Sequence, residues 1–294
     1  MIFSGAEQGI AYAILAALVW GTYIFAIKSY FVEYPPSVFV TVAYAFAFLW
    51  YLPLILYEQP SLSFGSPVRI TDISIIVGAI VLNAIGFLTS FRALSLGDVS
   101  YVAPISKITP VFVLPLEVVF LHEHLTPIQV GGVVLATFAV YLANYRSGSL
   151  LDPFRLAISY SPGRLALLTA VVFAVVDFLR RVILQEIGLT TEIWVFSSFA
   201  GMALTMVPFA SRRWASIQSD LPKFVVMGGL AAAGEHVTAL AFDSLSASIA
   251  SPILNTQAVV AVLLGGFLLR EDKLGLRLFA AGVAVAGVGI ITVF

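Results

Sequence analysis

The chain has 294 residues, of which 60% are hydrophobic and only 11% are charged. A soluble globular domain is about 45–50% apolar and about 25% charged, so a single core cannot hide this apolar surface and much of it must face lipid. The net charge of -1 gives no footprint for nucleic acid, and the absence of cysteine excludes disulfides and thiolate chemistry.

Ten apolar stretches follow one another along the chain, and each meets or approaches the length of about 20 residues that crosses a bilayer as a helix. The first is too long for the core of a signal peptide and follows Glu7 rather than a basic segment, so we expect it to be retained as a span. The sequence therefore predicts an all-α membrane protein with spans at 9–28, 37–57, 72–92, 99–121, 127–145, 164–186, 191–210, 222–242, 248–269 and 275–294.

The connections between these stretches are short and contain helix breakers. Tyr34-Pro35-Pro36 and Glu58-Gln59-Pro60 flank the second span, and Thr126-Pro127 is typical of an N-cap followed by proline at the first helical position. The longest polar stretch, 146–162, falls near the middle of the chain. We interpret it as a linker between two halves of five spans, 1–145 and 163–294.

The two halves resemble each other in sequence. A shift of 148 positions superposes Ser100 on Ser248, Pro104 on Pro252 and Glu123 on Glu271, with four apolar identities between them. A weaker register pairs Lys28 with Arg181. The pattern indicates an internal duplication.

An odd number of spans in each half has a topological consequence. The second half enters the membrane from the opposite side, so the halves form inverted repeats about an axis in the membrane plane. Transporters built in this way hold their substrate near the midplane between the repeats and rock one repeat against the other.

The same residues resemble an EamA domain of the drug/metabolite transporter superfamily. The resemblance covers nearly the whole chain, and the residues that carry it are Trp20-Gly21, Lys28, Ala93-Leu94, Pro104, Glu123, Leu125-Thr126 and Gly131-Gly132 in the first half, and Ala241-Phe242, Pro252, Glu271, Lys273 and Gly282 in the second. It implies ten spans and export of amino acids, drugs or other small metabolites across the cytoplasmic membrane, with no cofactor. Small multidrug relatives use a glutamate inside the first span, whereas residues 9–28 contain no acid, so their proton-antiport mechanism does not carry over.

The family resemblance and the distribution of Lys and Arg predict opposite membrane orientations. The family resemblance implies cytoplasmic termini, which would leave only Arg69, Arg180 and Arg181 on the cytoplasmic side. The positive-inside rule favours the reverse placement.

Lys107 is the foremost candidate for a substrate-binding residue. A charge at the bilayer centre costs about 2.5–3.5 kcal/mol on insertion scales, so an ionisable residue at that depth is a functional candidate. Lys107 lies between Pro104 and Pro110, which free backbone carbonyls and kink the helix, and its repeat partner is Asn255. A cation here would meet a substrate carboxylate or a facing acid, and the alternative is a snorkelling or structurally paired lysine.

Three further titratable residues are candidates for proton or charge coupling. Glu235 and His236 lie in the middle of the eighth predicted span, where Glu235 could balance Lys107 and His236 could take up a proton near neutral pH. Asp177 has Arg180 and Arg181 at i+3 and i+4, which favours an intrahelical ion pair. Glu117 lies close to the end of its span and is expected at the interface.

Polar and aromatic residues complete the predicted substrate site. Asn83, Gly86 and Ser90 share one helical face, and Asn255 and Gln257 follow Pro252 in the ninth span. Trp20 and Tyr23 lie deep in the first span, where they could stack on a substrate ring, although core packing is the simpler role.

His122-Glu123-His124 does not predict a metal site, because alternate residues on a helix diverge by about 200 degrees and the repeat copy, Arg270-Glu271-Asp272, has no histidine. Neither G-x-x-x-x-G-K-[ST] nor H-E-x-x-H nor G-x-S-x-G occurs, which argues against an ATP-driven step and against an enzyme. The sequence therefore predicts a secondary transporter for small polar metabolites, working as a monomer or homodimer in the lipid bilayer. A channel-like uniporter is the alternative, and an intramembrane enzyme a more distant one.

Overall fold

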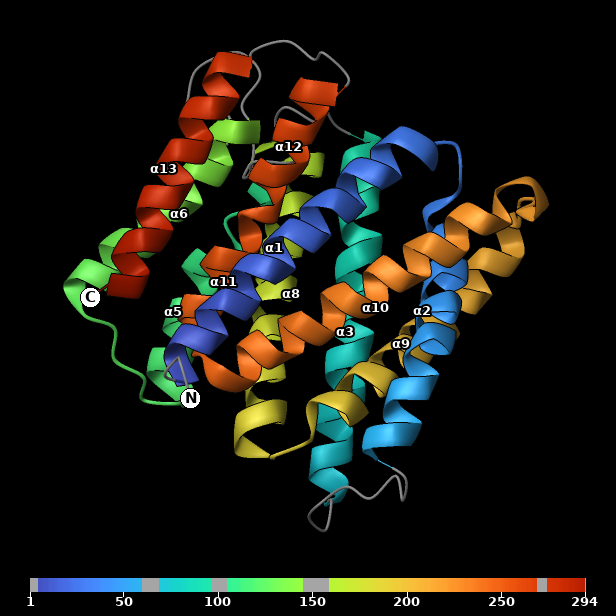
Figure 1. Cartoon of the computed structure of the whole chain (residues 1–294), viewed down its shortest axis with the longest axis horizontal. Helices are drawn as coiled ribbons and strands as arrows, with labels where there is room; N and C mark the ends of the chain where they lie inside the picture. The colour runs from blue at the N-terminus through green and yellow to red at the C-terminus, as the bar shows by residue number, and fades with distance from the viewer. Residues whose placement is uncertain (1–4, 60–68, 97–104, 145–158, 269–273, 294) are drawn as a thin grey trace.

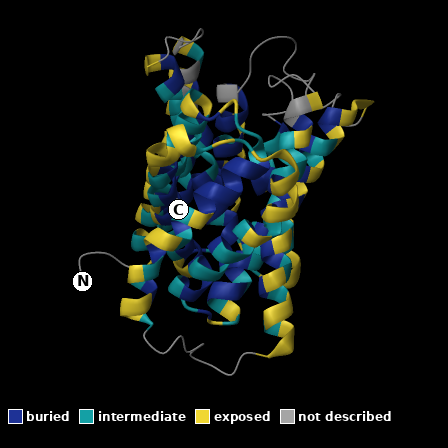
Figure 2. Cartoon of the chain, turned by 90° about the vertical axis from the view of Figure 1, so that its right-hand side faces the viewer, coloured by how far each residue is buried: buried dark blue, intermediate teal, exposed yellow. Residues whose placement is uncertain are grey.

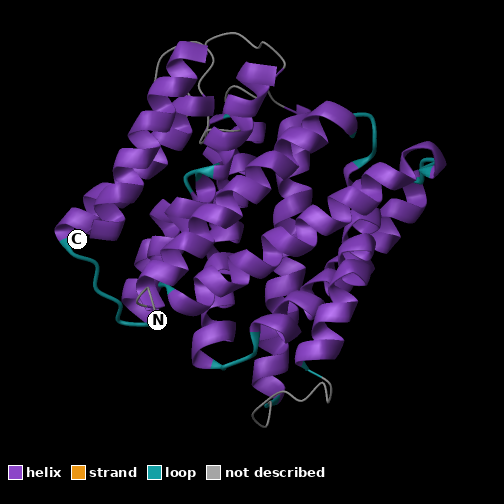
Figure 3. Ribbon diagram, in the orientation of Figure 1, coloured by secondary structure: helices purple, strands orange, loops and turns teal. Residues whose placement is uncertain are grey.

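Helices form every regular element in the described residues of the computed structural model, namely 5–59, 69–96, 105–144, 159–268 and 274–293 (Figures 1 and 3). In the first half these are α1 (Gly5–Tyr30), α2 (Pro36–Glu58), α3 (Ile70–Leu96), α5 (Thr109–Phe120) and α6 (Pro127–Asn144). In the second half they are α8 (Ser161–Arg181), the π-helix η1 (Val182–Glu186), α9 (Thr191–Ala210), the short 3-10 helices η2 (Ser211–Arg213) and η3 (Gln218–Asp220), α10 (Leu221–Ser244), α11 (Ala247–Asn255), α12 (Gln257–Leu268) and α13 (Leu274–Val293).

Within the described residues, six helical stretches are long and apolar enough to cross a membrane: Gly5–Tyr30, Pro36–Glu58, Ile70–Ala93, Thr191–Arg213, Gln218–Ser244 and Ala247–Leu268. Shorter apolar helices cover Thr109–Phe120, Pro127–Leu142 and Leu278–Ile291. The expected all-helical, multi-pass membrane architecture is therefore confirmed at this level, and each of the ten predicted ranges contains helix among its described residues.

The surface of the molecule is apolar where a soluble protein would be charged. Figure 2 shows buried residues gathered in the interior and exposed residues along the outer sides of the helices. Among the exposed side chains are Leu204, Phe279 and Val285, which suit contact with lipid tails and not with water.

The helices pack in pairs that join the two halves of the chain. α6 packs against α13 and α2 against α9, while α1 lies against α10 and α12. α8 contacts α3 and α5, α2 contacts α10, and α3 contacts α9, while α11 packs against α1, α5 and α6.

Two of the predicted spans are interrupted. Residues Ile105 and Ser106 are helical, but the helix breaks at Lys107 and Ile108 and starts again at Thr109 as α5. In the ninth predicted span, α11 ends at Asn255 and α12 begins at Gln257, with Thr256 between them. Both ends of α12 lie 148 positions after those of α5.

Glycines set the closest helix contacts. A methyl group at Gly228 of α10 would lie 2.4 Å from Cβ of Phe46 and 2.8 Å from the backbone nitrogen of Ala47 in α2. Gly132 of α6 and Gly287 of α13 approach the opposite backbone in the same way. Gly282 of α13, one of the residues that carry the family resemblance, has nothing within 4 Å of such a methyl group.

Gly228→Ala is expected to lower stability even though alanine is the better helix former. The added methyl group meets backbone atoms of α2, and overpacking of this kind costs about 1–3 kcal/mol. The matched control is Gly78→Ala in α3, where open space surrounds the new methyl group and helix propensity alone acts. Thermal unfolding in detergent should give a lower midpoint for Gly228→Ala and an unchanged or higher one for Gly78→Ala, and equal midpoints would contradict the close approach.

Candidate functional site

Arg180 occupies the centre of a buried polar cluster. Its Nη2 donates to Oε1 of Glu235 on α10 at 2.8 Å, and its Nη1 lies 3.6 Å from Oδ1 of Asp177 one turn earlier on α8. The rings of Trp194 and Phe242 lie 5.9 and 5.2 Å from the guanidinium carbon. Arg180 is thus held by two carboxylates and two aromatic faces, an arrangement suited to a planar, permanently charged guanidinium.

Asp177 extends the cluster towards the two interrupted spans. Its Oδ2 accepts a hydrogen bond of 2.6 Å from Ser251 of α11, and Asn255 donates to the Ser251 carbonyl oxygen at 2.9 Å. Lys107, at the break before α5, is close enough to Asp177 for the two charges to attract each other. We call Lys107, Asp177, Arg180, Glu235, Ser251 and Asn255 the Arg180 cluster.

Lys107 is the cation of this cluster that has no direct partner among the described residues. No hydrogen bond or ion pair joins it to the residues that the structure describes, whereas Arg180 contacts both carboxylates. With two cations and two carboxylates the cluster is formally neutral. It could therefore accept a zwitterion, or an anion together with a proton, without burying a net charge.

The structure assigns different partners to some predicted residues. Glu235 was expected to balance Lys107, but Arg180 takes that carboxylate. Asp177 pairs with Arg180 as expected, whereas Arg181 points to Glu117, Glu123 and Glu186. Consecutive residues on a helix point about 100 degrees apart, so Arg180 is directed towards Asp177 and Glu235 while Arg181 is directed towards the other three carboxylates.

His236 lies apart from the Arg180 cluster. Its Nδ1 is 2.8 Å from the hydroxyl of Tyr51 on α2, and the two rings also pack against each other. The charged groups that act on this imidazole are Glu58 and Glu192. His236 and Glu235 are neighbours in sequence but face different surroundings.

Trp20 and Tyr23 are packed into the helix bundle. Trp20 donates to the hydroxyl of Thr238 at 3.0 Å and covers Gly234 of α10, and its ring meets Tyr23 edge-on at 5.1 Å. Tyr23 is buried, and its hydroxyl has no hydrogen-bond partner among the described residues. Packing between α1 and α10 is the role that these contacts show for Trp20.

Asn83, Ser90 and Gln257 are half-buried, and their side chains form no hydrogen bond within the described ranges. Gly86, from the face of α3 that carries Asn83 and Ser90, contacts Phe173 of α8 closely. Gln257 begins α12, and its backbone oxygen approaches Gly21 of α1. The three polar side chains therefore have free hydrogen-bonding groups, but none of them bonds to a member of the Arg180 cluster.

Glu117 is a buried carboxylate that the sequence analysis did not include among the candidate site residues. It was expected at the interface, yet its side chain is 0% exposed and accepts hydrogen bonds from the backbone of Ala247 and Ser248. The signal was available, because Glu117 is an ionisable residue in an otherwise apolar stretch, as Lys107 is.

Comparison with known proteins places this geometry in a family context. Residues 7–145 match the EamA-like transporter family. The first half of the chain is thus similar to an EamA-like transporter domain. The resemblance to the drug/metabolite transporter superfamily is thereby confirmed over these residues, and members of the EamA-like family are transporters of small molecules in the lipid bilayer.

The EamA-like domain is part of a fold that known structures share. A solved structure named "Crystal structure of protein" superposes with a TM-score of 0.78 and 16% sequence identity, covering 98% of each chain. At this identity the similarity shows the fold alone. None of the curated proteins matches the chain.

A charged pair at the edge of the molecule provides a contrast to the Arg180 cluster. Asp220 accepts a hydrogen bond of 2.7 Å from the hydroxyl of Tyr34 and one of 2.6 Å from Lys223. The hydrogen bond to this carboxylate raises the pKa of Tyr34, which connects α1 and α2. Half of the Lys223 side chain is exposed, so water can replace either partner.

Arg180→Ala is expected to destabilise the protein strongly, because it leaves the Glu235 carboxylate buried without its partner. Breaking a buried pair from one side costs about 3–5 kcal/mol. The double variant Arg180→Ala/Glu235→Ala should recover part of the loss, whereas Lys223→Ala at the exposed pair should change little. Thermal midpoints in detergent test this, and strictly additive losses would show that the two side chains do not interact.

Proposed function

We propose that this chain is a secondary transporter of small polar metabolites such as amino acids, acting as an exporter or exchanger in the cytoplasmic membrane. The observation that carries the proposal is the Arg180 cluster, in which residues of α8, α10 and α11 lie near the helix break before α5 and Lys107 has no direct partner among the described residues. Because the EamA-like family consists of transporters, a small-molecule substrate is the expected ligand of this cluster.

The proposed mechanism is alternating access between two inverted repeats, 1–145 and 163–294, joined by 146–162. The equal 148-residue offset of α5 and α12 supports it, since both helices restart at the same register position after a break. The helix packing supports it too. In the proposed repeat α1 corresponds to α8, α3 to α10 and α5 to α12, so the contact α1–α10 has its counterpart in α3–α8, and α1–α12 in α5–α8. Broken helices at a repeat interface are where transporters of this kind bind substrate.

We infer that the substrate carries a carboxylate or another small anionic group, which Lys107 binds. An ammonium in a protein interior gains most from a charged partner, and both carboxylates of the cluster already contact Arg180. Asn255, Gln257, Asn83 and Ser90 would offer hydrogen bonds to the rest of the molecule, and Tyr23 and Trp20 a flanking aromatic surface.

Lys107→Ala should abolish saturable counterflow of labelled amino acids in proteoliposomes, because the anionic group of the substrate then lacks its cation. Lys107→Arg keeps the charge and should retain part of the activity. Both variants should match the parent in expression and in detergent stability, since Lys107 has no direct partner to lose within the described residues. Parental counterflow in Lys107→Ala at normal expression would remove Lys107 from the binding site.

We also propose that Glu235 couples transport to protons, with Asp177 sharing the charge of Arg180. Glu235→Gln mimics the protonated carboxyl, so the transport rate should become nearly flat between about pH 5 and about pH 8. His236→Gln should keep the parental pH profile, because His236 contacts Tyr51 and lies outside the cluster. A flat profile in His236→Gln with a parental profile in Glu235→Gln would transfer the coupling role to the histidine.

A further inference from the structure

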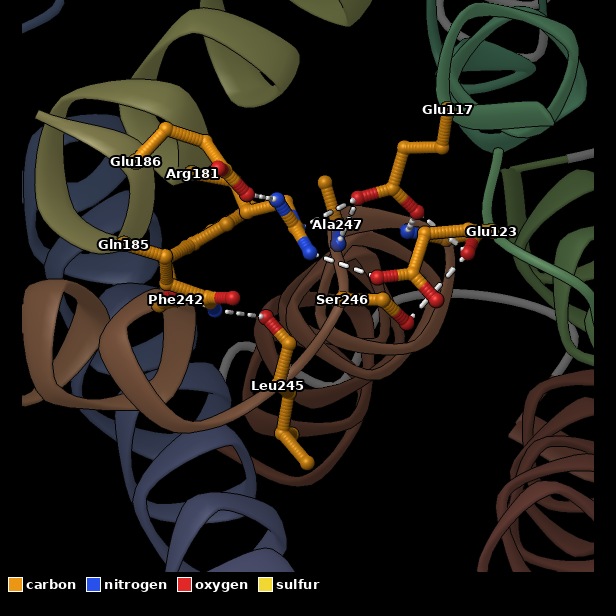
Figure 4. A network of polar contacts seen from close by, with 10 residues as sticks. Glu117, Glu123, Arg181, Gln185, Glu186, Phe242, Leu245, Ser246 and Ala247 are labelled. Atoms are coloured by element: carbon orange, nitrogen blue, oxygen red, sulfur yellow. Dashed lines mark hydrogen bonds and ion pairs between the residues drawn. The ribbon is translucent and has the colours of Figure 1, made fainter. Parts of the chain in front are cut away.

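A second charged network surrounds Arg181, one residue after the centre of the Arg180 cluster. Its guanidinium lies 3.3 Å from Glu117, 2.5 Å from Glu123 and 2.7 Å from Glu186, measured to one carboxylate oxygen of each (Figure 4). Glu117 belongs to α5 and Glu123 to the segment before α6, while Arg181 and Glu186 belong to α8 and η1. The network therefore connects the two halves of the chain.

Glu117 also caps a helix of the other half. Its carboxylate accepts hydrogen bonds from the backbone N–H groups of Ala247 and Ser248 and from the Ser248 hydroxyl. These residues begin α11, whose own N-cap residue, Ser246, makes no capping hydrogen bond with its side chain. A carboxylate at this position satisfies free N–H donors and meets the positive end of the helix dipole.

The neighbouring chain segment is held at the same end. Gln185 of η1 donates to the carbonyl oxygens of Phe242 and Leu245, which end α10. The short connection between α10 and α11 is thus fixed from both sides, by Gln185 on one and by Glu117 on the other (Figure 4).

The contacts across this interface are of a kind that can open. The contacts between α6 and α13 are different: there, glycines pack against the backbone of the opposite helix, and this packing is lost if the helices separate. The contacts of Arg181 are two hydrogen bonds to carboxylates, those of Glu123 and Glu186, and an ion pair with Glu117, and water can replace them. Exposure is graded across the network: the side chain of Glu117 is 0% exposed, that of Glu123 is 36% and that of Glu186 is 52%. Water has a route to the network as soon as the halves separate.

We propose that Glu117, Glu123, Arg181 and the N-terminus of α11 form the gate at one mouth of the transporter, closed in this structure. The inference rests on the proposed function, because it assumes that the two halves move against each other. When the mouth opens, Glu117 releases α11 and Glu123 releases Arg181, and water enters between α5 and α11. Glu186 stays with Arg181, since both belong to the same half.

The internal repeat predicts a second acidic and basic pair that corresponds to Glu123 and Arg181. The repeat copy of Glu123 is Glu271, and that of Arg181 is Lys28 at the end of α1. In an inverted pair of repeats these two residues belong to the other mouth. Glu271 lies outside the described residues.

Cysteine labelling tests the gate directly, because the parent chain contains no cysteine. Ala247→Cys places a thiol at the buried start of α11 and keeps the backbone N–H that Glu117 binds. Its rate of reaction with a hydrophilic maleimide, measured in nanodiscs where both faces are accessible, reports opening. Ser216→Cys, at an exposed position, corrects for differences in reagent and sample.

Glu123→Gln should raise the labelling rate of Ala247→Cys by about tenfold, the effect of one lost charge-assisted hydrogen bond on an opening equilibrium. Glu186→Gln is the matched control: it removes a carboxylate from the same guanidinium but from the same half, so the rate should stay parental. Glu123→Asp, which keeps the charge, should give an intermediate rate and guards against a folding defect in Glu123→Gln. Equal rates in Glu123→Gln and Glu186→Gln, whether both raised or both unchanged, would overturn the gate. Labelling needs no substrate, so it tests the gate separately from counterflow, which tests the proposed function.

Discussion

Two adjacent arginines on one mostly apolar helix impose the constraint that organises the interior. Neither Arg180 nor Arg181 can lose its charge, and both are buried, so each needs carboxylate partners inside the protein. Because neighbouring residues on a helix point in different directions, the two demands are met in different places. Arg180 pairs with Glu235 of α10. Arg181 pairs with Glu117 of α5, which in turn binds the start of α11. α8 thereby connects the proposed substrate site with the proposed gate.

Sequence reasoning could predict the helices because lipid makes hydrophobic length a strong signal. It placed helix in all ten ranges, and the family resemblance is confirmed over residues 7–145. It could also select Lys107, Asp177, Glu235 and Asn255, since a polar residue in an apolar stretch is rare enough to stand out. The structure brings these four into or beside one cluster.

The pairing of these residues was beyond the same reasoning. Periodicity gives the face on which a side chain lies, but it says nothing about which helix covers that face. Glu235 was therefore assigned to Lys107 when Arg180 was in reach, and Glu117 was assigned to the interface when α11 covers it. The helix breaks at Ile108 and Thr256 were equally hidden, because the prolines near them predict a kink but not its exact place.

The π-helix η1 explains one contact that an α-helix could not make. Arg181 and Glu186 are five residues apart, a spacing that places two side chains on different faces of an α-helix. In the wider turn of a π-helix, where each N–H bonds five residues back, the same spacing brings them together. The direction of the side chains in η1, including that of Gln185 towards the end of α10, depends on the extra residue in this turn. Shortening the segment by a single residue would restore α-helical geometry and rotate those side chains away, so chain length here acts as a specificity element in its own right.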